Sequence, residues 1–182
     1  MFPSKMRVLA EVAIFSAIAL VFDKFPLFTM PQGGSVSLVM LPILLLSLRH
    51  GWQIGLLTGG IVGTIQLFYG GYFLNIFQVF LDYALSYAGI GLAGLVAPLL
   101  TKQKDLRQAA LIISLSGLLG GSIRLLATFL SGIIFYADYA PASTPVWFYS
   151  FTYNISYILP STIIACILLI LLYKARPNFY TL

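Results

Sequence analysis

The chain has 182 residues, of which 60% are hydrophobic and only 8% are charged. A soluble domain typically carries about 25% charged residues, so this composition excludes an ordinary water-soluble protein and indicates one that lies in the lipid bilayer. The net charge of +5 does not indicate nucleic-acid binding, because the basic residues are few and lie at the ends of apolar runs. The length suits roughly six spans of about 20 residues with short connections.

Glycine and proline divide the apolar sequence into six predicted helices, which we expect to form one domain over residues 1–182. The predicted ranges are about 6–24, 38–50, 52–69, 74–101, 106–136 and 145–174. The first range is interrupted by Glu11 and has no cleavage site after it, which indicates a retained span and not a signal peptide. The second is short and contains Pro42, so we expect it to be tilted, kinked or partly re-entrant. Thr144 followed by Pro145 predicts the N-cap and first turn of the last helix.

The positions of Lys and Arg predict the orientation in the membrane, because cytoplasmic segments carry an excess of these residues. With the N-terminus inside, the inner segments hold Lys5, Arg7, Arg49, Lys102, Lys104, Arg107, Lys174 and Arg176. The outer segments hold only Lys24. Both termini are therefore predicted to be cytoplasmic, and a ligand is expected to enter through the longer, aromatic-rich outer loops.

The predicted helix 74–101 carries a stripe of polar residues, Asn75, Gln78, Asp82 and Ser86, whose spacing places them on one face. In hydrocarbon such a face must turn toward protein or a water-filled cavity. Asp82 is expected about 10 Å below the outer start of the helix, at the floor of an outward-facing pocket. A structural ion pair between Asp82 and Arg124 is the alternative interpretation.

The predicted helix 106–136 places Arg124, Thr128, Gly132 and Tyr136 on one face through repeated four-residue spacing. A hydroxyl, a glycine and an aromatic ring on this face suit a pocket wall, and they equally suit close helix packing.

The last predicted helix contains Asn154 about ten residues from its start, deeper than an interfacial aromatic belt extends. Its amide offers two donors and an acceptor, which suit the edge of a heterocycle. Tyr149 lies roughly 140° away around the helix, so the two residues reach one ligand only from either side of a cleft.

Aromatic faces combined with a single carboxylate suit a flat cationic or amine-bearing ligand. Catalysis is not supported, because the sequence lacks paired carboxylates and the metalloprotease, serine hydrolase and ATP-binding motifs. His50, the only histidine, is expected to be a solvated residue of an inner turn, and the single Cys166 excludes a thiolate metal cluster. We therefore predict a protein that is not an enzyme, needs no cofactor, and takes energy for any active transport from a partner or an ion gradient.

Two predicted helices carry stripes of small residues that allow another helix to approach closely. These are Ala10, Ala13 and Ala17 in the first helix and Gly55, Gly59 and Gly63 in the third. Either stripe is compatible with internal packing or with docking to another membrane protein.

Three segments resemble the thiamine-specific S component of energy-coupling factor (ECF) transporters: GGSVSLVMLPILLLSLRHG, IRLLATFLSGIIFYADYAP and PVWFYSFTYNISYILP. The resemblance implies a six-helix bundle in a prokaryotic cell membrane that binds thiamine from outside. It also implies docking on a transmembrane T component that carries two ATPase subunits. Ala13 and Ala17 match the A-x-x-x-A docking element of this family.

The resemblance also implies a set of substrate-binding residues. The family's acidic residue followed by tyrosine corresponds to Asp82 and Tyr83, and a tyrosine ten residues earlier corresponds to Tyr72. The tyrosine and asparagine of the last helix correspond to Tyr149 and Asn154.

On the fifth helix the family motif R-x-x-x-H-F-x-x-G, followed four residues later by an aromatic residue, matches Arg124, Phe129, Gly132 and Tyr136. Thr128 replaces the motif's histidine, Tyr136 the frequent tryptophan, and Asp82 the usual glutamate. With these changes, the expected ligand is either thiamine itself or a related molecule, meaning a precursor or analogue such as the aminopyrimidine fragment.

Two alternatives from other functional classes remain at the level of sequence. One is a stand-alone proton-coupled transporter in which Asp82 is the coupling acid. The other is a structural or assembly protein without a ligand, in which Asp82 only pairs with Arg124.

Overall fold

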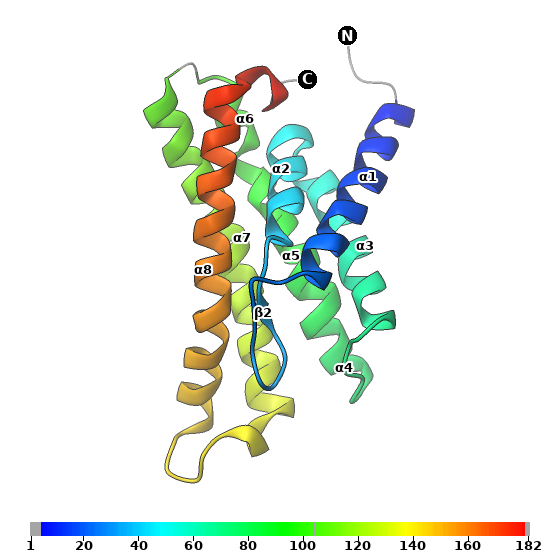
Figure 1. The fold of residues 1–182 in the computed structure, drawn as a ribbon, viewed down its shortest axis with the longest axis vertical. Helices are drawn as coiled ribbons and strands as arrows, with labels where there is room; N and C mark the ends of the chain where they lie inside the picture. Colours follow the sequence, from blue (N-terminus) through cyan, green and yellow to red (C-terminus); the bar gives the residue numbers. More distant parts are fainter. Residues whose placement is uncertain (1–4, 104, 181–182) are drawn as a thin grey trace.

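The computed structural model describes residues 5–103 and 105–180, which form a bundle of six helical segments with a small hairpin (Figure 1). The first half of the chain contains α1 Lys5–Lys24, β1 Phe28–Thr29, β2 Ser35–Val36, α2 Met40–His50 and α3 Trp52–Phe68. The fourth segment consists of α4 Ile76–Val79, η1 Phe80–Leu85, α5 Ser86–Ile90, η2 Gly91–Val96 and α6 Ala97–Leu100. The last part contains α7 Leu106–Phe135, η3 Ala137–Tyr139, α8 Val146–Ala175 and η4 Pro177–Tyr180.

The lengths of the segments agree with a protein that crosses a membrane. Among the described residues, three segments are both long and apolar enough to span one: 76–100, α7 and α8. The helix α1 has 20 residues, whereas the apolar helices α2 and α3 have 11 and 17. The predicted helix ranges therefore match the structure within about two residues, which is the usual uncertainty of helix ends.

The fourth segment is not a regular helix. Its middle part, η1, is a π-helix, and η2 is a 3₁₀-helix, so the backbone is first under-wound and then over-wound. Short π-helical turns are frequently found at functional sites. Asp82 lies within η1, so the acid identified in the sequence occupies the irregular part of its helix.

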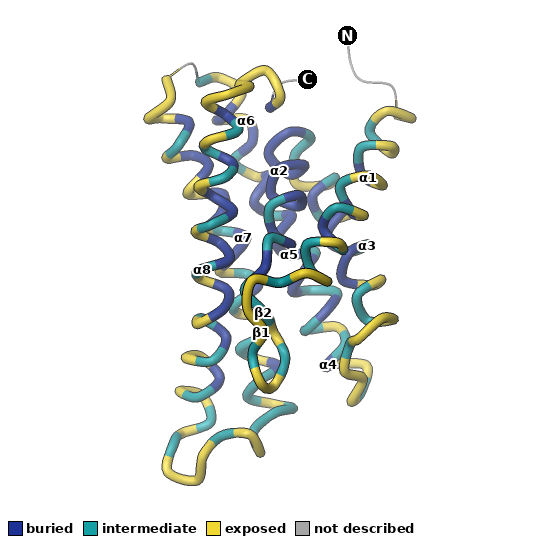
Figure 2. Tube along the Cα trace, in the orientation of Figure 1, coloured by how far each residue is buried: buried dark blue, intermediate teal, exposed yellow. Residues whose placement is uncertain are grey.

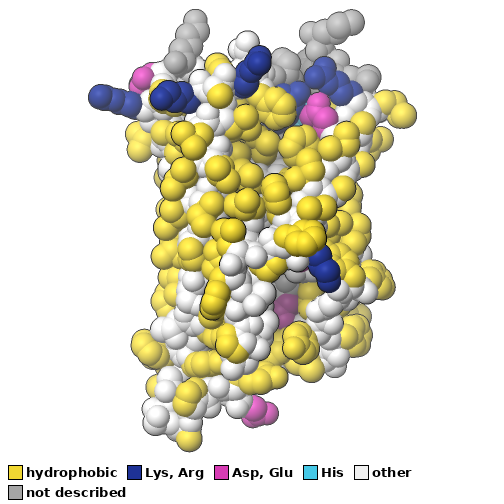
Figure 3. Space-filling view, in the orientation of Figure 1, with side chains coloured by type: hydrophobic (Ala, Val, Ile, Leu, Met, Phe, Trp, Pro, Cys, Tyr) yellow, Lys and Arg dark blue, Asp and Glu magenta, His cyan; other side chains and the backbone are white. Residues whose placement is uncertain are grey.

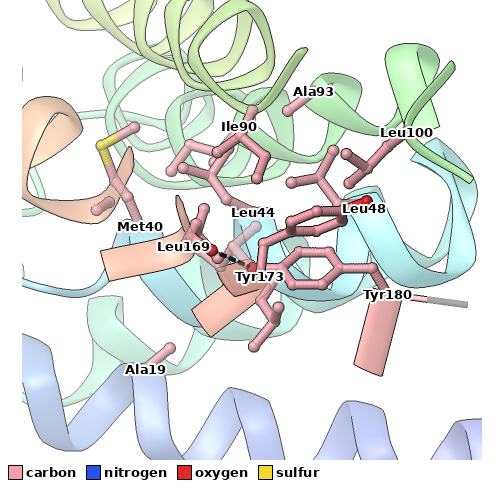
Figure 4. Close-up of a cluster of buried hydrophobic side chains, with 14 of the residues drawn as sticks. Ala19, Met40, Leu44, Leu48, Ile90, Ala93, Leu100, Leu169, Tyr173 and Tyr180 are labelled. Atoms are coloured by element: carbon pink, nitrogen blue, oxygen red, sulfur yellow. Dashed lines mark hydrogen bonds between the residues drawn. The ribbon is translucent and has the colours of Figure 1, made fainter. Parts of the chain in front are cut away.

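The helix α2 lies at the centre of the bundle and carries much of the core. Nine of its 11 residues are buried, and Figure 2 shows it as the most continuously buried helix. Figure 4 shows Met40, Leu44 and Leu48 of α2 beside Leu169 and Tyr173 of α8. Pro42 lies in the first turn, where a backbone N–H has no partner within the helix, so the kink expected from the sequence is not required.

Basic side chains gather at the end of the molecule that carries both termini, above a broad apolar belt (Figure 3). At this end Glu11 of α1 accepts hydrogen bonds from Arg49 Nε at 2.8 Å and lies 2.7 Å from His50 Nε2. Arg49 also donates to the carbonyl of Phe179. The side chain of His50 is only 2% exposed, so the prediction of a solvated turn residue was wrong. The reason is the carboxylate of Glu11, which contacts the side chains of both Arg49 and His50 and so links α1 to α2.

The start of α8 also differs from the prediction. The helix begins at Val146 and Pro145 is its N-cap, with a non-helical ψ of 134°. Thr144 belongs instead to the preceding turn, in which its N–H donates to the carbonyl of Pro141 at 2.8 Å.

The two stripes of small residues have different surroundings. Side-chain atoms added at Gly55, Gly59 and Gly63 of α3 would collide with the backbone of Gly91, Tyr87 and Tyr83, respectively. The glycine stripe therefore serves internal packing of α3 against the fourth segment. Ala10, Ala13 and Ala17 of α1, in contrast, are exposed.

The close contact of α3 predicts a difference between two adjacent glycines. Gly59→Ala places a methyl group against the carbonyl of Tyr87, whereas a methyl group at Gly60 meets nothing within 4 Å. We expect Gly59→Ala to lower the free energy of unfolding by about 1–3 kcal/mol, because overpacking forces the helices apart. Gly60→Ala should leave it unchanged or raise it by up to about 1 kcal/mol. Thermal unfolding of the purified variants in detergent measures both effects, and equal melting temperatures would contradict this packing.

Candidate functional site

A cavity lies beneath the β1–β2 hairpin, between the end of α3, η1, α5, α7 and α8. All eight residues predicted to bind substrate line it, although they come from segments far apart in the sequence. They are Tyr72, Asp82, Tyr83, Thr128, Gly132, Tyr136, Tyr149 and Asn154. The geometry therefore brings the predicted set together at one place.

Asp82 is held from two sides. Its Oδ2 accepts a hydrogen bond from Gln78 Nε2 at 2.6 Å and one from the Tyr136 hydroxyl at 3.2 Å. Gln78 is completely buried, and its Oε1 accepts from the N–H of Leu74 at 3.1 Å, which fixes its amide. Gln78 is therefore a positioning residue for Asp82 and does not itself line the cavity.

The predicted polar stripe is only partly a pocket wall. Asp82 and Ser86 line the cavity, whereas Asn75 is the N-cap of α4 and accepts hydrogen bonds from Phe77 N and Gln78 N. Asn75 lies outside the stripe because α4 begins only at Ile76, whereas Gln78 still shares the face of Asp82, to which its amide donates at 2.6 Å.

The alternative of a structural ion pair between Asp82 and Arg124 is wrong. Among the described residues, the ion pairs all involve Glu11 and none involves Asp82 or Arg124. The guanidinium carbon of Arg124 lies 4.9 Å from the ring centre of Tyr87, a cation–π contact, and the side chain lines the cavity. Asp82 thus lines the cavity with no ion-pair partner in the described part of the chain.

The predicted face of α7 serves both roles that the sequence left open. Arg124, Thr128, Gly132 and Tyr136 all line the cavity. Gly132 also allows α8 to approach, because a side-chain atom there would collide with the hydroxyl of Ser150. The same face of α7 therefore forms a wall of the cavity and packs against α8.

Asn154 lines the cavity, but its amide already has protein partners. Its Nδ2 donates to the carbonyl of Ser150 at 2.8 Å, and its Oδ1 accepts from the Tyr157 hydroxyl at 2.6 Å. The second lone pair of Oδ1 can still accept a hydrogen bond from a ligand. Tyr149 lies on the same wall, with its ring centre 5.7 Å from that of Tyr153.

The hairpin and the residue that holds it were missed by the sequence reasoning. The hydroxyl of Tyr153 accepts from Gln32 N and donates to the carbonyl of Gly33, both at 2.9 Å. Gly33 and Gly34 have φ values of 89° and 82°, which only glycine adopts without strain, and both line the cavity. The four-residue spacing of Tyr149, Tyr153 and Tyr157 was a signal for this wall, but an interfacial aromatic belt has the same appearance.

This contact predicts that Tyr153→Phe loosens the hairpin, because it removes the hydroxyl that bonds both Gln32 and Gly33. We expect amide hydrogen exchange in residues 27–36 to become roughly tenfold faster, as one to two net hydrogen bonds are lost. Thr152→Val is the control, since the Thr152 hydroxyl bonds only within its own helix in the described contacts. Unchanged exchange in Tyr153→Phe would show that the hairpin is held by other contacts.

Comparisons with known proteins identify the family. The model of the family described as "Thiamine transporter protein (Thia_YuaJ)" matches residues 9–181. The thiamine transporter ThiT of Bacillus subtilis (strain 168) is 40% identical over 176 residues, which cover 93% of this chain and 92% of that protein. ThiT of Lacticaseibacillus paracasei is 27% identical over 185 residues, which cover 97% of this chain and 91% of that protein.

A solved structure of ThiT from Listeria monocytogenes has the same fold, with a TM-score of 0.90, 24% identity, and coverage of 98% of this chain and 99% of that chain. It confirms the predicted all-α bundle of six helical segments. The bacterial relatives confirm a multi-pass protein of the plasma membrane, and a family of transporters confirms the prediction that the protein is not an enzyme. The resemblance drawn from the sequence is thereby confirmed, and the chain belongs to the thiamine transporter protein (Thia_YuaJ) family.

Proposed function

We propose that this chain is the substrate-capture subunit of an ECF-type importer and binds thiamine from the extracellular side. The observation that carries the proposal is Asp82, a carboxylate that faces a cavity in the membrane-spanning bundle without a cationic partner among the described residues. A half-buried, unpaired carboxylate in a membrane-spanning bundle is costly, and a ligand of opposite charge would balance it.

The remaining wall of the cavity suits a flat cation. Eight tyrosines line it: Tyr72, Tyr83, Tyr87, Tyr136, Tyr139, Tyr149, Tyr153 and Tyr157. Tyrosine rings attract a cation through their faces and stack on flat heterocycles, while their hydroxyls remain available for hydrogen bonds. Thiamine combines a cationic ring with an aminopyrimidine and therefore matches both properties of the cavity.

The site also favours thiamine over its neutral aminopyrimidine fragment. A neutral ligand would enclose Asp82 and leave its charge unbalanced, whereas the cationic ring of thiamine neutralises it. Asp82 has a shorter side chain than the glutamate usual in the family, and the Tyr136 hydroxyl donates a hydrogen bond to it at 3.2 Å. Asp82 and Tyr136 therefore form a hydrogen-bonded pair at the positions where the family usually has glutamate and tryptophan. We propose the eight predicted lining residues as the substrate site on this basis.

The partners that we propose are a transmembrane T component and two ATPase subunits. The chain has no ATP-binding motif, so ATP-driven uptake requires subunits that supply one. Ala13 and Ala17 lie on the exposed face of α1, where small side chains let a partner helix approach closely. The part-buried cluster around Glu11 fixes α1 at its cytoplasmic end and so holds this face in a defined position.

The proposal predicts that Asp82→Asn abolishes tight binding without unfolding the protein. The asparagine keeps the size and can still accept from Gln78, but the charge that balances the cation is lost. We expect thiamine affinity to fall at least about 100-fold in isothermal titration calorimetry, with a melting temperature close to that of the parent. Asp138→Asn, in the exposed turn η3, is the matched control and should bind as the parent does. Undiminished binding by Asp82→Asn would contradict the proposed site.

A second prediction separates binding from docking. Ala13→Trp and Ala17→Trp should leave thiamine binding by the purified subunit unchanged but reduce uptake at least about tenfold, because the bulky ring blocks close helix approach. Ser114→Trp, an exposed small-to-large change on α7, is the control. Uptake is measured in cells that also produce the T component and the ATPase subunits. Uptake by this chain alone, abolished by an uncoupler, would instead support a stand-alone proton-coupled transporter.

A further inference from the structure

Residues 68–77, which we call the α3–α4 loop, expose large apolar side chains around the connection from α3 to α4. Phe68 is 82% exposed, Phe73 70% and Phe77 71%. Figure 2 shows this connection as exposed, beside the labelled ends of α3 and α4. No Lys, Arg, Asp or Glu occurs within residues 51–81, so the loop has no charged side chain that requires water. Several large apolar side chains exposed on one short segment indicate a contact with a partner or with the membrane.

The length of α3 places this loop at the outer edge of the membrane and not far beyond it. The helix begins directly after the inner turn at Gly51 and has 17 residues, so it is about 26 Å long. This is less than the hydrocarbon core of a typical bilayer, about 30 Å. The helices α7 and α8 have 30 residues each, about 45 Å, and Figure 1 shows their outer ends farther from the termini than α4.

A contact between α1 and the loop marks the same level. Lys24 is the last residue of α1, and its Nζ lies 5.7 Å from the ring centre of Tyr69. A lysine at a helix end and a tyrosine are both typical of the membrane interface. The α3–α4 loop therefore begins at the level of the outer interface, whereas the turn between η3 and α8 lies beyond it.

The backbone of the loop has hydrogen-bond partners in neighbouring side chains. A non-helical chain in contact with lipid needs such partners, because no water is available there. Tyr72 N donates to the Tyr83 hydroxyl at 2.6 Å. Leu74 N donates to Gln78 Oε1 at 3.1 Å, and Asn75 Oδ1 accepts from two N–H groups of α4 at 3.0 Å each. Gln78 and Tyr83 are buried, so they hold the loop from the protein side and leave its apolar side chains outside.

We propose that the α3–α4 loop is immersed in the outer leaflet of the membrane and anchors one wall of the cavity to lipid. Tyr72 belongs to this loop and lines the cavity, so the loop separates the cavity from the lipid on this side. A water-soluble cation then has to enter past the other outer loops. The inference goes beyond the proposed function and does not depend on which ligand the cavity takes.

The composition of the loop favours lipid over a partner protein as its neighbour. Contacts between membrane helices are enriched in small residues, which allow the backbones to approach. The exposed side chains of the loop are instead bulky, and they are those of phenylalanine, tyrosine, leucine and isoleucine. The exposed small residues that we propose for docking lie on α1, at Ala13 and Ala17.

Spin labelling of the full chain in lipid nanodiscs tests the depth of the loop. Cys166, which is buried, is replaced by serine, and a single cysteine is then introduced as Phe73→Cys or as the control Ser143→Cys. Both positions are exposed, but Ser143 lies in the turn between η3 and α8. We expect the ratio of collisions with oxygen to collisions with a water-soluble nickel complex to be at least about threefold higher at position 73, because apolar oxygen concentrates in hydrocarbon.

Equal collision ratios at the two positions would place the loop in water and overturn the proposal. A label at position 73 that reports water in the subunit alone, and becomes shielded only on assembly with the T component, would show a protein contact and also overturn it. Neither measurement requires a ligand, so a negative result leaves the proposed function untouched.

A second pair of variants tests the paired backbone. Tyr83→Phe removes the acceptor for Tyr72 N–H, which should draw the loop toward water and lower the collision ratio of the Phe73→Cys label at least about twofold. Tyr69→Phe is the matched control, since it removes a hydroxyl from the same loop but keeps the ring that faces Lys24. The same ratio in both variants would overturn the role of the Tyr83 hydroxyl in holding the loop in the leaflet.

Discussion

A carboxylate placed in an apolar helix has to be kept out of hydrocarbon, and the arrangement around Asp82 follows from that constraint. The π-helical turn η1 carries Asp82, and the buried amide of Gln78 holds it at 2.6 Å. The hydroxyl of Tyr136, the C-cap of α7, donates to Asp82, and the hairpin held by Tyr153 covers the resulting cavity. The glycine stripe of α3 allows the irregular fourth segment to pack closely against α3. The position of Asp82, the cavity and this helix contact therefore depend on one another.

Two charged side chains line the cavity. The guanidinium of Arg124 lies against the ring of Tyr87, a cation–π contact. Asp82 has hydrogen bonds but no cationic partner among the described residues, so its charge is available to a ligand. A cationic ligand would balance this charge, and the tyrosine-rich wall supplies faces on which a flat ring can stack. Thiamine is both cationic and flat.

The extent to which the sequence predicted the site depends on the regularity of each segment. The helix α7 is regular over 30 residues, so four-residue spacing placed Arg124 and Tyr136 on the cavity face correctly. The fourth segment begins at Ile76, two residues later than expected, so Asn75 is its N-cap and not a member of the polar stripe. His50 was misplaced because its partner Glu11 lies 39 residues away, a contact that no local pattern encodes. The hairpin was missed because its strands have two residues each, too few for a detectable alternation.

Capture of thiamine by the cavity is tested most directly by the identity of the small molecule that co-purifies with the protein. The subunit is purified in detergent from cells grown with thiamine, and the ligand released on denaturation is identified by mass spectrometry. We expect thiamine at close to one molecule per chain, and none in protein carrying Asp82→Asn. A different ligand, or none in the parent protein, would contradict it.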